Sequence, residues 1–372
     1  MRACAAVVGL ALIVLAASAA SASALPARFW GVVPQLTPSR EQFQRLNRGG
    51  VRVTRIPIEW AGAQPKRGGP FSWGSTDAAV ENAVANGIAV LPFLVGAPSW
   101  AVPQASVQGG HGAKAPAKLP VSGAGASGWR SFLQEAVRRY GPGGSFWSEH
   151  PELAELPIRE WQVWNEPNFK YFVAKPNPAE YGKLVKASFT AIKSVDPGAK
   201  VILAGMFARP KGARNPKTGK HKSINWYASD FLEQMYKTNP GIKSKFNGVA
   251  LHPYTIHYQD LTPEIEEFRG ILGENHDAAK GLWITELGWS SEAPSPGDQF
   301  AKGVAGQARE LRGAFQLLRA KQAKWKLQQV DWFSVNDQQG ACNFCGGSGL
   351  FGEGFKPKKA WYEYVKFAGG RP

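Results

Sequence analysis

The stretch that decides the fold reads Ile158-Arg159-Glu160-Trp161-Gln162-Val163-Trp164-Asn165-Glu166-Pro167-Asn168. Its isoleucine, valine and tryptophan residues favour a short buried strand. The strand must stop at Asn-Glu-Pro-Asn, because proline has no N–H for a sheet ladder and asparagine favours turns. The sequence therefore predicts a carboxylate, Glu166, at the point where a strand ends. Taken alone, such a glutamate is most often a solvated loop residue.

A second acid lies in matching surroundings. Residues 282–289 read Leu-Trp-Ile-Thr-Glu-Leu-Gly-Trp, again an apolar run that ends in a glutamate, Glu286. In a parallel α/β barrel the carboxyl ends of all strands surround one mouth, where active sites are built. We therefore expect Glu166 and Glu286 to meet there as a pair.

Strand and helix patterns alternate along the chain. Predicted strands cover 29–33, 51–58, 88–95, 158–164, 201–205, 246–252, 281–286 and 329–335. Predicted helices cover 37–46, 75–87, 129–140, 177–196, 226–236, 263–272, 298–323 and 361–367. Eight alternations favour a single (β/α)8 barrel with long β-to-α loops, such as the one over 97–128. No Gly-x-Gly-x-x-Gly follows the first strand, which argues against a dinucleotide-binding fold.

The N-terminus has the pattern of a secretory signal peptide. Arg2 precedes an apolar run, and Ala22-Ser23-Ala24 matches a cleavage site, so residues 1–24 are expected to be removed and 25–372 to form one domain. The alternative is an uncleaved membrane anchor. No other run is long enough to span a bilayer. We expect a secreted protein that makes no membrane contact after cleavage.

Removal of the signal leaves two cysteines, Cys342 and Cys345. In an oxidising compartment they are expected to form a local disulfide that stiffens a loop. A redox Cys-x-x-Cys motif would need a thioredoxin-like βαβ context, and a zinc site would need two further ligands nearby. Neither is present in the surrounding sequence.

The chain carries 44 Lys+Arg against 28 Asp+Glu, a net charge of +16. We find no helix-turn-helix, zinc-finger or RNA-recognition pattern, so no nucleic-acid partner is expected. Positive charge concentrates from Arg209 to Lys222, RPKGARNPKTGKHK, which contains no acid. Such a run is commonly a solvated loop. The alternative is contact with an anionic polymer at the cell surface.

Three motifs carry a resemblance to a known group of enzymes. They are Trp-Asn-Glu-Pro-Asn at 164–168, Leu-His-Pro-Tyr at 251–254, and Trp-Ile-Thr-Glu-Leu-Gly-Trp at 283–289. With the strand pattern they resemble the clan A (4/7) retaining glycoside hydrolases, which have a (β/α)8 barrel. The likeness spans 29–367 and is greatest to cellulase-like family 5 and to family 39 xylosidase-like members. It implies hydrolysis of glycosidic bonds without a cofactor or metal.

The resemblance implies roles for four polar residues. Glu166 would be the acid/base and Glu286 the nucleophile of a two-step displacement, with carboxyl groups about 5–5.5 Å apart. Arg55 would support the nucleophile electrostatically. Asn165 would bind the sugar 2-hydroxyl.

His252 and Tyr254 lie two residues apart on the sixth predicted strand, so they share one face. By the resemblance, Tyr254 would reach the nucleophile or the substrate and His252 would accompany it. A satisfied core histidine is the alternative for His252. His257 is five residues from His252 and on the opposite face of a continuing strand, which argues against a metal pair.

Three tryptophans lie just past predicted strand ends, Trp60, Trp100 and Trp289, and a fourth, Trp332, lies within the eighth predicted strand. Flat aromatic faces stack on sugar rings, so each is a candidate substrate platform, and packing is the alternative. Trp332 departs from the clan pattern because it lies early in the eighth predicted strand. The sequence alone therefore does not identify the residue that forms the floor of the sugar site.

We expect a secreted retaining O-glycosyl hydrolase whose substrate is a cell-wall polysaccharide or oligosaccharide, with exo and endo action both open. A catalytically silent carbohydrate-binding barrel at the cell surface is the alternative. The presence of Arg55, Asn165, Glu166 and Glu286 together argues against the silent barrel.

Overall fold

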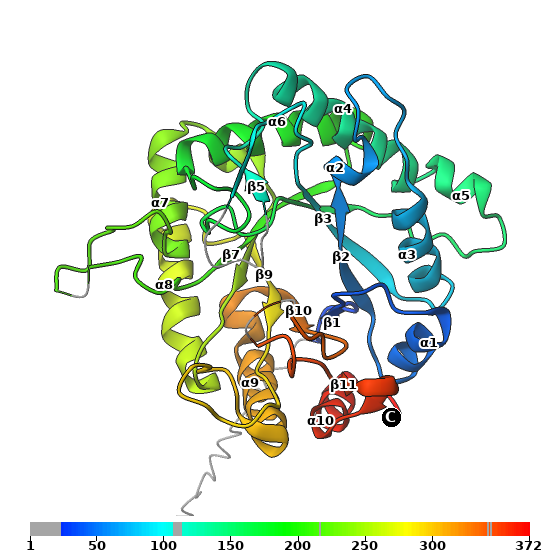
Figure 1. Ribbon diagram of the computed structural model, residues 1–372, viewed down its shortest axis with the longest axis vertical. Helices are drawn as coiled ribbons and strands as arrows, with labels where there is room; N and C mark the ends of the chain where they lie inside the picture. Colours follow the sequence, from blue (N-terminus) through cyan, green and yellow to red (C-terminus); the bar gives the residue numbers. More distant parts are fainter. Residues whose placement is uncertain (1–23, 107–113, 216, 341, 343) are drawn as a thin grey trace, which may run out of the picture.

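Eight parallel strands close into a barrel in the order β1-β10-β9-β8-β7-β6-β3-β2 (Figure 1). The computed structural model describes residues 24–106, 114–215, 217–340, 342 and 344–372. The barrel strands are β1 Trp30–Val33, β2 Val53–Glu59, β3 Ala89–Val95, β6 Glu160–Val163, β7 Lys200–Phe207, β8 Gly248–His252, β9 Gly281–Leu287 and β10 Leu327–Phe333. All eight correspond to predicted strands, which confirms the (β/α)8 barrel.

Helices surround the barrel (Figure 1). They are α1 Arg40–Arg48, α2 Trp60–Ala63, α3 Gly74–Val84, α4 Gly123–Tyr140, α5 Ser145–Glu149, α6 Pro178–Val195, α7 Ala228–Thr238, α8 Leu261–Glu274, α9 Gly303–Trp325 and α10 Lys359–Ala368. Three 3-10 turns, η1 Ile242–Lys245, η2 Tyr258–Asp260 and η3 Glu353–Phe355, lie between them. Two small antiparallel pairs, β4 Gln104–Ser106 with β5 Lys114–Pro116 and β11 Phe351–Gly352 with β12 Lys356–Pro357, were not predicted.

Helix starts differ most from the predictions. Helix α1 begins after Ser39, whose hydroxyl and the side chain of Gln42 form a capping box, so the Thr37-Pro38 signal stands two residues too early. Helix α4 begins at Gly123, well before the predicted start at 129. Helix α9 begins at Gly303, later than the predicted 298. The signals at these starts are weak, since neither α4 nor α9 has a side-chain cap.

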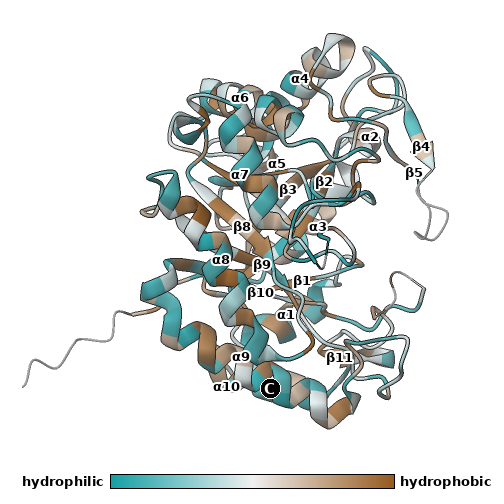
Figure 2. Ribbon diagram, turned by 90° about the vertical axis from the view of Figure 1, so that its left-hand side faces the viewer, coloured by the Kyte–Doolittle hydropathy of each residue, from teal (hydrophilic) through white to brown (hydrophobic). Residues whose placement is uncertain are grey.

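The barrel strands are largely hydrophobic, while the surrounding helices alternate hydrophobic and hydrophilic residues (Figure 2). One group of buried side chains fills the barrel toward the amino-terminal ends of the strands: Val53, Leu91, Ile202, Ala250 and Trp283. We call this group the lower layer. It closes the bottom of the barrel, so the barrel is a packed core, with its site at the carboxyl ends of the strands.

Two further predictions concern the chain outside the barrel. The predicted disulfide joins Cys342 to Cys345 in the loop after β10. The predicted signal peptide, residues 1–24, lies almost wholly outside the described residues. Within the described part of the chain, we find no helix with the length and apolar character needed to cross a membrane.

Candidate active site

A sharp turn after β6 brings Glu166 to the mouth of the barrel. Trp164 and Glu166 have positive φ angles of 75° and 40°, which are unusual for residues with a side chain and cost strain. The turn is held by the Glu166 amide, which donates to the Gly205 carbonyl at 3.0 Å. The indole of the buried Trp164 donates to the Phe172 carbonyl at 3.2 Å. These contacts fix Asn165 and Glu166 together at the end of the strand.

A bulge in β9 brings Glu286 to the same place. Val330 pairs with Ile284 and Trp332 pairs with Leu287, so β9 has one residue more than β10 over this interval. Side chains normally alternate between the two faces of a strand, and a bulge breaks that alternation. Thr285 and its neighbour Glu286 can therefore both point into the barrel.

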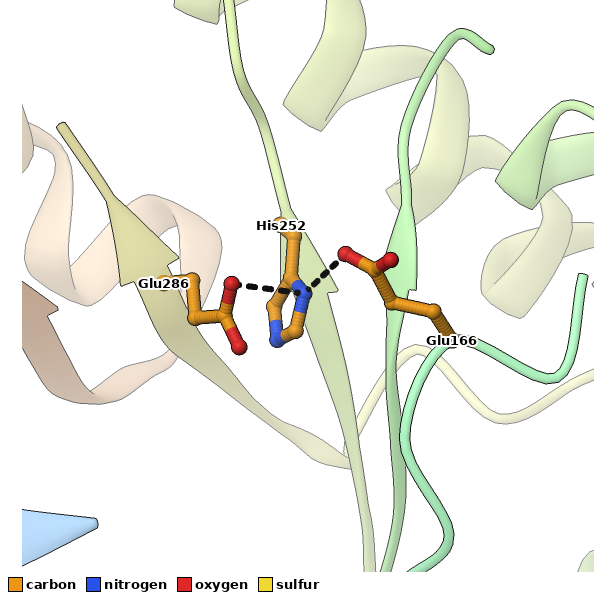
Figure 3. Close-up of side chains that lie close together, drawn as sticks. All are labelled: Glu166, His252 and Glu286. Atoms are coloured by element: carbon orange, nitrogen blue, oxygen red, sulfur yellow. Dashed lines mark hydrogen bonds and ion pairs between the residues drawn. The ribbon is translucent and has the colours of Figure 1, made fainter. Parts of the chain in front are cut away.

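The two glutamates face each other across His252 (Figure 3). The Nδ1 atom of His252 lies 2.7 Å from Oε1 of Glu166 and 3.5 Å from Oε2 of Glu286. One carboxylate oxygen from each glutamate and a ring nitrogen of His252 all lie within 4.8 Å of one another. Side chains from the turn after β6, from β8 and from β9 therefore meet at the carboxyl ends of the strands.

Arg55 and Tyr254 both contact Glu286. Arg55 Nη1 donates to Oε1 of Glu286 at 2.7 Å, and the Tyr254 hydroxyl donates to Oε2 at 2.8 Å. Arg55 Nη2 also donates to Oδ1 of Asn165 at 2.6 Å. Because Oδ1 of Asn165 is occupied by Arg55, the amide Nδ2 is the atom that remains to bind a sugar hydroxyl.

The surroundings separate the two carboxyl groups electrostatically. Burial raises the pKa of Glu166 well above its ordinary value, and the charge of Glu286 adds to the rise. Burial also raises the pKa of Glu286, but the charge of Arg55 and the hydrogen bonds from Tyr254 and Arg55 oppose that rise. Burial and the charge of Arg55 lower the pKa of His252, which keeps its ring neutral. The pKa of Glu166 is therefore raised further than that of Glu286, whose charged form Arg55 and Tyr254 favour.

Within the described residues, Glu166, His252 and Glu286 form the only group close enough to hold a metal ion. Both oxygens of Glu286 already accept hydrogen bonds, one from the cationic Arg55. A divalent ion would have to displace that guanidinium. The arrangement fits chemistry by the carboxyl groups themselves better than it fits a metal ion.

The structure corrects three of the four tryptophan predictions. Trp60, Trp289 and Trp332 are fully buried, so none presents a ring face to a sugar. Trp60 packs on Trp100 and Trp129, while Trp332 packs on Trp289 and on Phe315 of α9. Trp100 is half-buried and stays a candidate platform.

Phenylalanines surround the site where tryptophans were expected. Five half-buried rings form a connected group around Tyr254: Phe169, Phe207, Phe300, Phe333 and Phe344. Phe333 is the last residue of β10, and Phe207 the last of β7. These phenylalanines were not predicted from the sequence. The available indication was an aromatic residue at the end of a barrel strand, which is also how the tryptophan candidates were recognised.

Two buried polar residues, Gln162 and Thr285, were also missed. Gln162 accepts from Nε of Arg55 at 2.7 Å, and Thr285 lies 2.9 Å from Nε2 of His252. Each is a polar residue inside an otherwise apolar strand. That pattern was the available signal, since a buried polar side chain needs partners.

Solved structures share this fold. A family 39 glycoside hydrolase from the gut symbiont Bacteroides cellulosilyticus WH2 has a TM-score of 0.63 and 19% identity, over 92% of this chain and 64% of that one. A monomeric β-xylosidase from Caulobacter crescentus CB15 has a TM-score of 0.62 and 19% identity, over 92% and 68%. A family 5 glycoside hydrolase from Bifidobacterium longum has a TM-score of 0.61 and 13% identity, over 92% and 78%. The chain thus spans about two thirds of the length of the first two, and identities this low establish the fold alone.

The sequence itself matches a family model. The model described as glycosyl hydrolase catalytic core matches residues 152–343, just over half of the chain. The matched region contains Asn165, Glu166, His252, Tyr254 and Glu286, the residues that meet at the mouth of the barrel. The chain belongs to the glycosyl hydrolase catalytic core family.

Proposed function

We propose that this protein is a retaining O-glycoside hydrolase in which Glu286 is the nucleophile and Glu166 the acid/base. The observation that carries the proposal is the approach of one oxygen from each carboxylate to within 4.8 Å of the other. Retaining glycosidases hold their carboxyl groups about 5–5.5 Å apart, whereas inverting ones leave about 6.5–9.5 Å for a water molecule. The short separation supports double displacement.

In the first step Glu286 attacks the anomeric carbon while Glu166 gives its proton to the leaving oxygen, so the glycosidic C–O bond breaks as the new C–O bond forms. Arg55 and Tyr254 stabilise the negative charge of Glu286 before attack. In the second step Glu166, now ionised, takes a proton from water, and the resulting hydroxide displaces Glu286. The amide of Asn165 binds the 2-hydroxyl, where hydrogen bonds strengthen as positive charge develops on the sugar.

The substrate proposed first is a β-xyloside or a related cell-wall oligosaccharide. Two of the solved structures with this fold are described as a β-xylosidase and as a family 39 glycoside hydrolase. The half-buried ring of Phe333, which contacts Tyr254 edge to face, offers an apolar surface for the less polar side of a sugar.

A panel of nitrophenyl glycosides and dyed polysaccharides tests the proposal. The wild-type protein should release product from at least one substrate, and Glu166→Gln and Glu286→Gln should each lose at least about 10²-fold in kcat/KM on it. Trp100→Phe serves as a comparison that leaves both carboxyl groups in place. Retention of a glycan without turnover by the wild type would favour the carbohydrate-binding barrel instead.

A second proposal, independent of the first, concerns what the basic loop over 209–222 binds. Arg214 pairs with Asp230 of α7 at 2.6 Å and with Glu267 of α8 at 2.7 Å, and Arg209 pairs with Glu267 at 2.7 Å. These pairs fasten the loop beside α7 and α8, where it projects from the barrel (Figure 1). Four exposed lysines supply its outward charge: Lys211, Lys217, Lys220 and Lys222.

The proposed partner of these lysines is an anionic cell-surface polymer. Changing all four to glutamine should abolish retention on an acidic glycan at low salt and leave retention on a neutral glycan unchanged. High salt should have the same effect on the wild-type protein, because salt screens exposed charges. Equal retention of both proteins on both glycans would remove the proposed contact.

Secretion is also proposed, with cleavage after Ala24. The disulfide between Cys342 and Cys345 supports it, since such bonds persist in oxidising compartments. N-terminal sequencing of the protein from the culture medium should begin at Leu25, and retention of residues 1–24 on a membrane-bound form would favour the anchor.

A further inference from the structure

We infer that Gln162, Thr285 and His252 form a hydrogen-bond relay of fixed direction from Arg55 to Glu166, and that this relay decides which oxygen of Glu166 carries the proton. The inference rests on the proposed function, because it assigns positioning roles to residues around its acid/base. Its geometry, however, is testable without any substrate.

The direction of the relay is set at Arg55. A guanidinium has only donors, so Nε of Arg55 donates to Oε1 of Gln162 at 2.7 Å. The amide nitrogen of Gln162 must then be the other terminal atom. That nitrogen lies 3.2 Å from the Leu203 carbonyl and 3.3 Å from the Thr285 hydroxyl oxygen. A carbonyl can only accept, which confirms that Gln162 Nε2 donates and that Thr285 Oγ1 receives its hydrogen bond.

The next two hydrogen bonds follow from the first two. Thr285 has one hydroxyl proton, and among the described partners of its oxygen only Nε2 of His252, 2.9 Å away, can accept that proton, so Thr285 donates to Nε2. A neutral imidazole that accepts at Nε2 carries its proton on Nδ1. Nδ1 of His252 therefore donates to Oε1 of Glu166 at 2.7 Å.

Burial fixes this direction. The side chains of Arg55, Gln162, Thr285 and His252 have no exposed surface, so bulk water cannot replace any partner. Gly205 makes room for the relay, because a Cβ at that position would overlap Nε2 of His252. A reversed bond between Thr285 and His252 would leave the buried Thr285 hydroxyl proton without an acceptor among its described partners.

The relay leaves one oxygen of Glu166 for the reaction. Oε1 accepts from His252, so the proton of the acid form resides on Oε2. In the first step that proton passes from Oε2 to the leaving oxygen, and in the second step a proton from water returns to Oε2. His252 stays neutral in both steps, and it is a positioning residue that carries no proton of the reaction.

Nitrogen-15 NMR of the histidine side chains in the full chain tests the relay. The sequence has six histidines, and a His252→Gln spectrum identifies the signal of His252. In the wild-type protein Nδ1 should appear protonated and Nε2 unprotonated near neutral pH. A proton on Nε2, or on both nitrogens, would overturn the inference.

The isosteric change Gln162→Glu should reverse the relay. A glutamate accepts from Arg55 with one oxygen and from Thr285 with the other, so the Thr285 oxygen must accept from Nε2–H of His252. The proton should then move to Nε2. In a Thr285→Val background, Gln162→Glu should leave Nε2 of His252 unprotonated, because no hydroxyl then connects residue 162 to the imidazole. Equal effects of Gln162→Glu in both backgrounds would mean that charge acts through space, and the relay would be rejected.

Controls separate this test from loss of structure and from failure of the proposed function. Thr285→Ser keeps the hydroxyl and should retain the wild-type tautomer. Thr54→Val removes a buried hydroxyl that has no hydrogen-bond partner, so it should change neither tautomer nor activity. On an active substrate, Gln162→Glu should lower kcat/KM about 10- to 100-fold more for a poor leaving group than for a dinitrophenyl one, since only the former needs the acid. If the wild-type protein has no glycosidase activity, the proposed function is refuted. The tautomer of His252 in the wild-type protein would still show whether the relay has the inferred direction.

Discussion

The interior of the barrel has two layers, built by the same strands, that differ in chemistry. The lower layer contains Val53, Leu91 and Trp283. Two residues further along those strands, the upper layer has Arg55, Phe93 and Thr285. On β8 the same step leads from Ala250 to His252. The five lower-layer side chains are thus apolar, with the buried carboxyl of Asp331 on β10 beside Val53 as the polar exception, and the upper layer is largely polar and surrounds the glutamate pair.

The comparison shows which part of the barrel interior lowers the free energy of unfolding. Burying polar and charged side chains is unfavourable unless each finds a partner. In the upper layer Arg55 is the shared donor, since it contacts Glu286, Gln162 and Asn165. The five lower-layer side chains need no such partners, and Asp331 beside them accepts hydrogen bonds from Gln329 at 2.8 Å. The contrast predicts that upper-layer changes affect chemistry and stability together, whereas lower-layer changes affect stability alone.

The largest expected effect is that of Arg55→Met. It leaves Glu286 without its buried cation and leaves acceptors on Gln162 and Asn165 unpaired, so we expect a loss of about 3–5 kcal/mol in unfolding free energy. Activity should fall by at least about 10²-fold in the folded fraction. Urea unfolding and kcat/KM, measured on the same preparation, check both. Full activity would contradict the shared-donor role.

Leu91→Ala is the matched change in the lower layer. Leu91 is buried in β3, two residues before Phe93. The cavity should cost about 2–5 kcal/mol in unfolding free energy. The kcat/KM of the folded protein should stay within about threefold of the wild-type value, well below the loss expected at a catalytic group. A large loss of activity at unchanged stability would mean that the two layers are not separable.

Glu264 is a buried carboxyl outside the barrel interior, and it can be compared with Glu286. Burial raises the pKa of Glu264, on α8, to about 7. Its Oε2 atom has no hydrogen-bond partner, and its nearest cation, Nε of Arg209, is 3.8 Å away. Glu286, by contrast, has close donors on both oxygens.

Because the pKa of Glu264 in the folded protein lies above its ordinary value of 4.5, protonation of Glu264 stabilises the native state. Its contribution is complete below pH 4.5 and is lost as pH rises through about 7. Glu264→Gln should therefore be more stable than wild type at pH 8, by up to about 3 kcal/mol. Thermal unfolding of both proteins at pH 5 and pH 8 measures the difference. An equal gap at the two pH values would contradict the assigned pKa.

Much of this arrangement follows from the sequence. The strands follow from runs of β-branched and aromatic residues, and Glu166 and Glu286 follow from their places at strand ends. Arg55, His252 and Tyr254 are expected from the resemblance, and in the structure Arg55 and Tyr254 contact Glu286 while His252 contacts Glu166. These are local signals, which pattern reading recovers well.

Other features depend on tertiary structure and could not be predicted in this way. The bulge that turns both Thr285 and Glu286 inward appears only when β9 is paired with β10. The positive φ angles of Trp164 and Glu166 are imposed by contacts of the turn with β7 and with the loop. Trp60 and Trp289 are candidates from their places after predicted strand ends, and Trp332 from the tryptophan that the clan has on its eighth strand, but the rings of all three are buried in packing contacts.

The most direct test of the central claim is covalent trapping of the nucleophile. The protein is incubated with a 2-deoxy-2-fluoro glycoside that carries a dinitrophenyl leaving group, made from the sugar that the nitrophenyl panel selects, and its peptides are analysed by mass spectrometry. We predict one fluoro-sugar adduct on Glu286, and no adduct in Glu286→Gln. An adduct on another residue would contradict the account, as would inverted stereochemistry in the first product of an active enzyme.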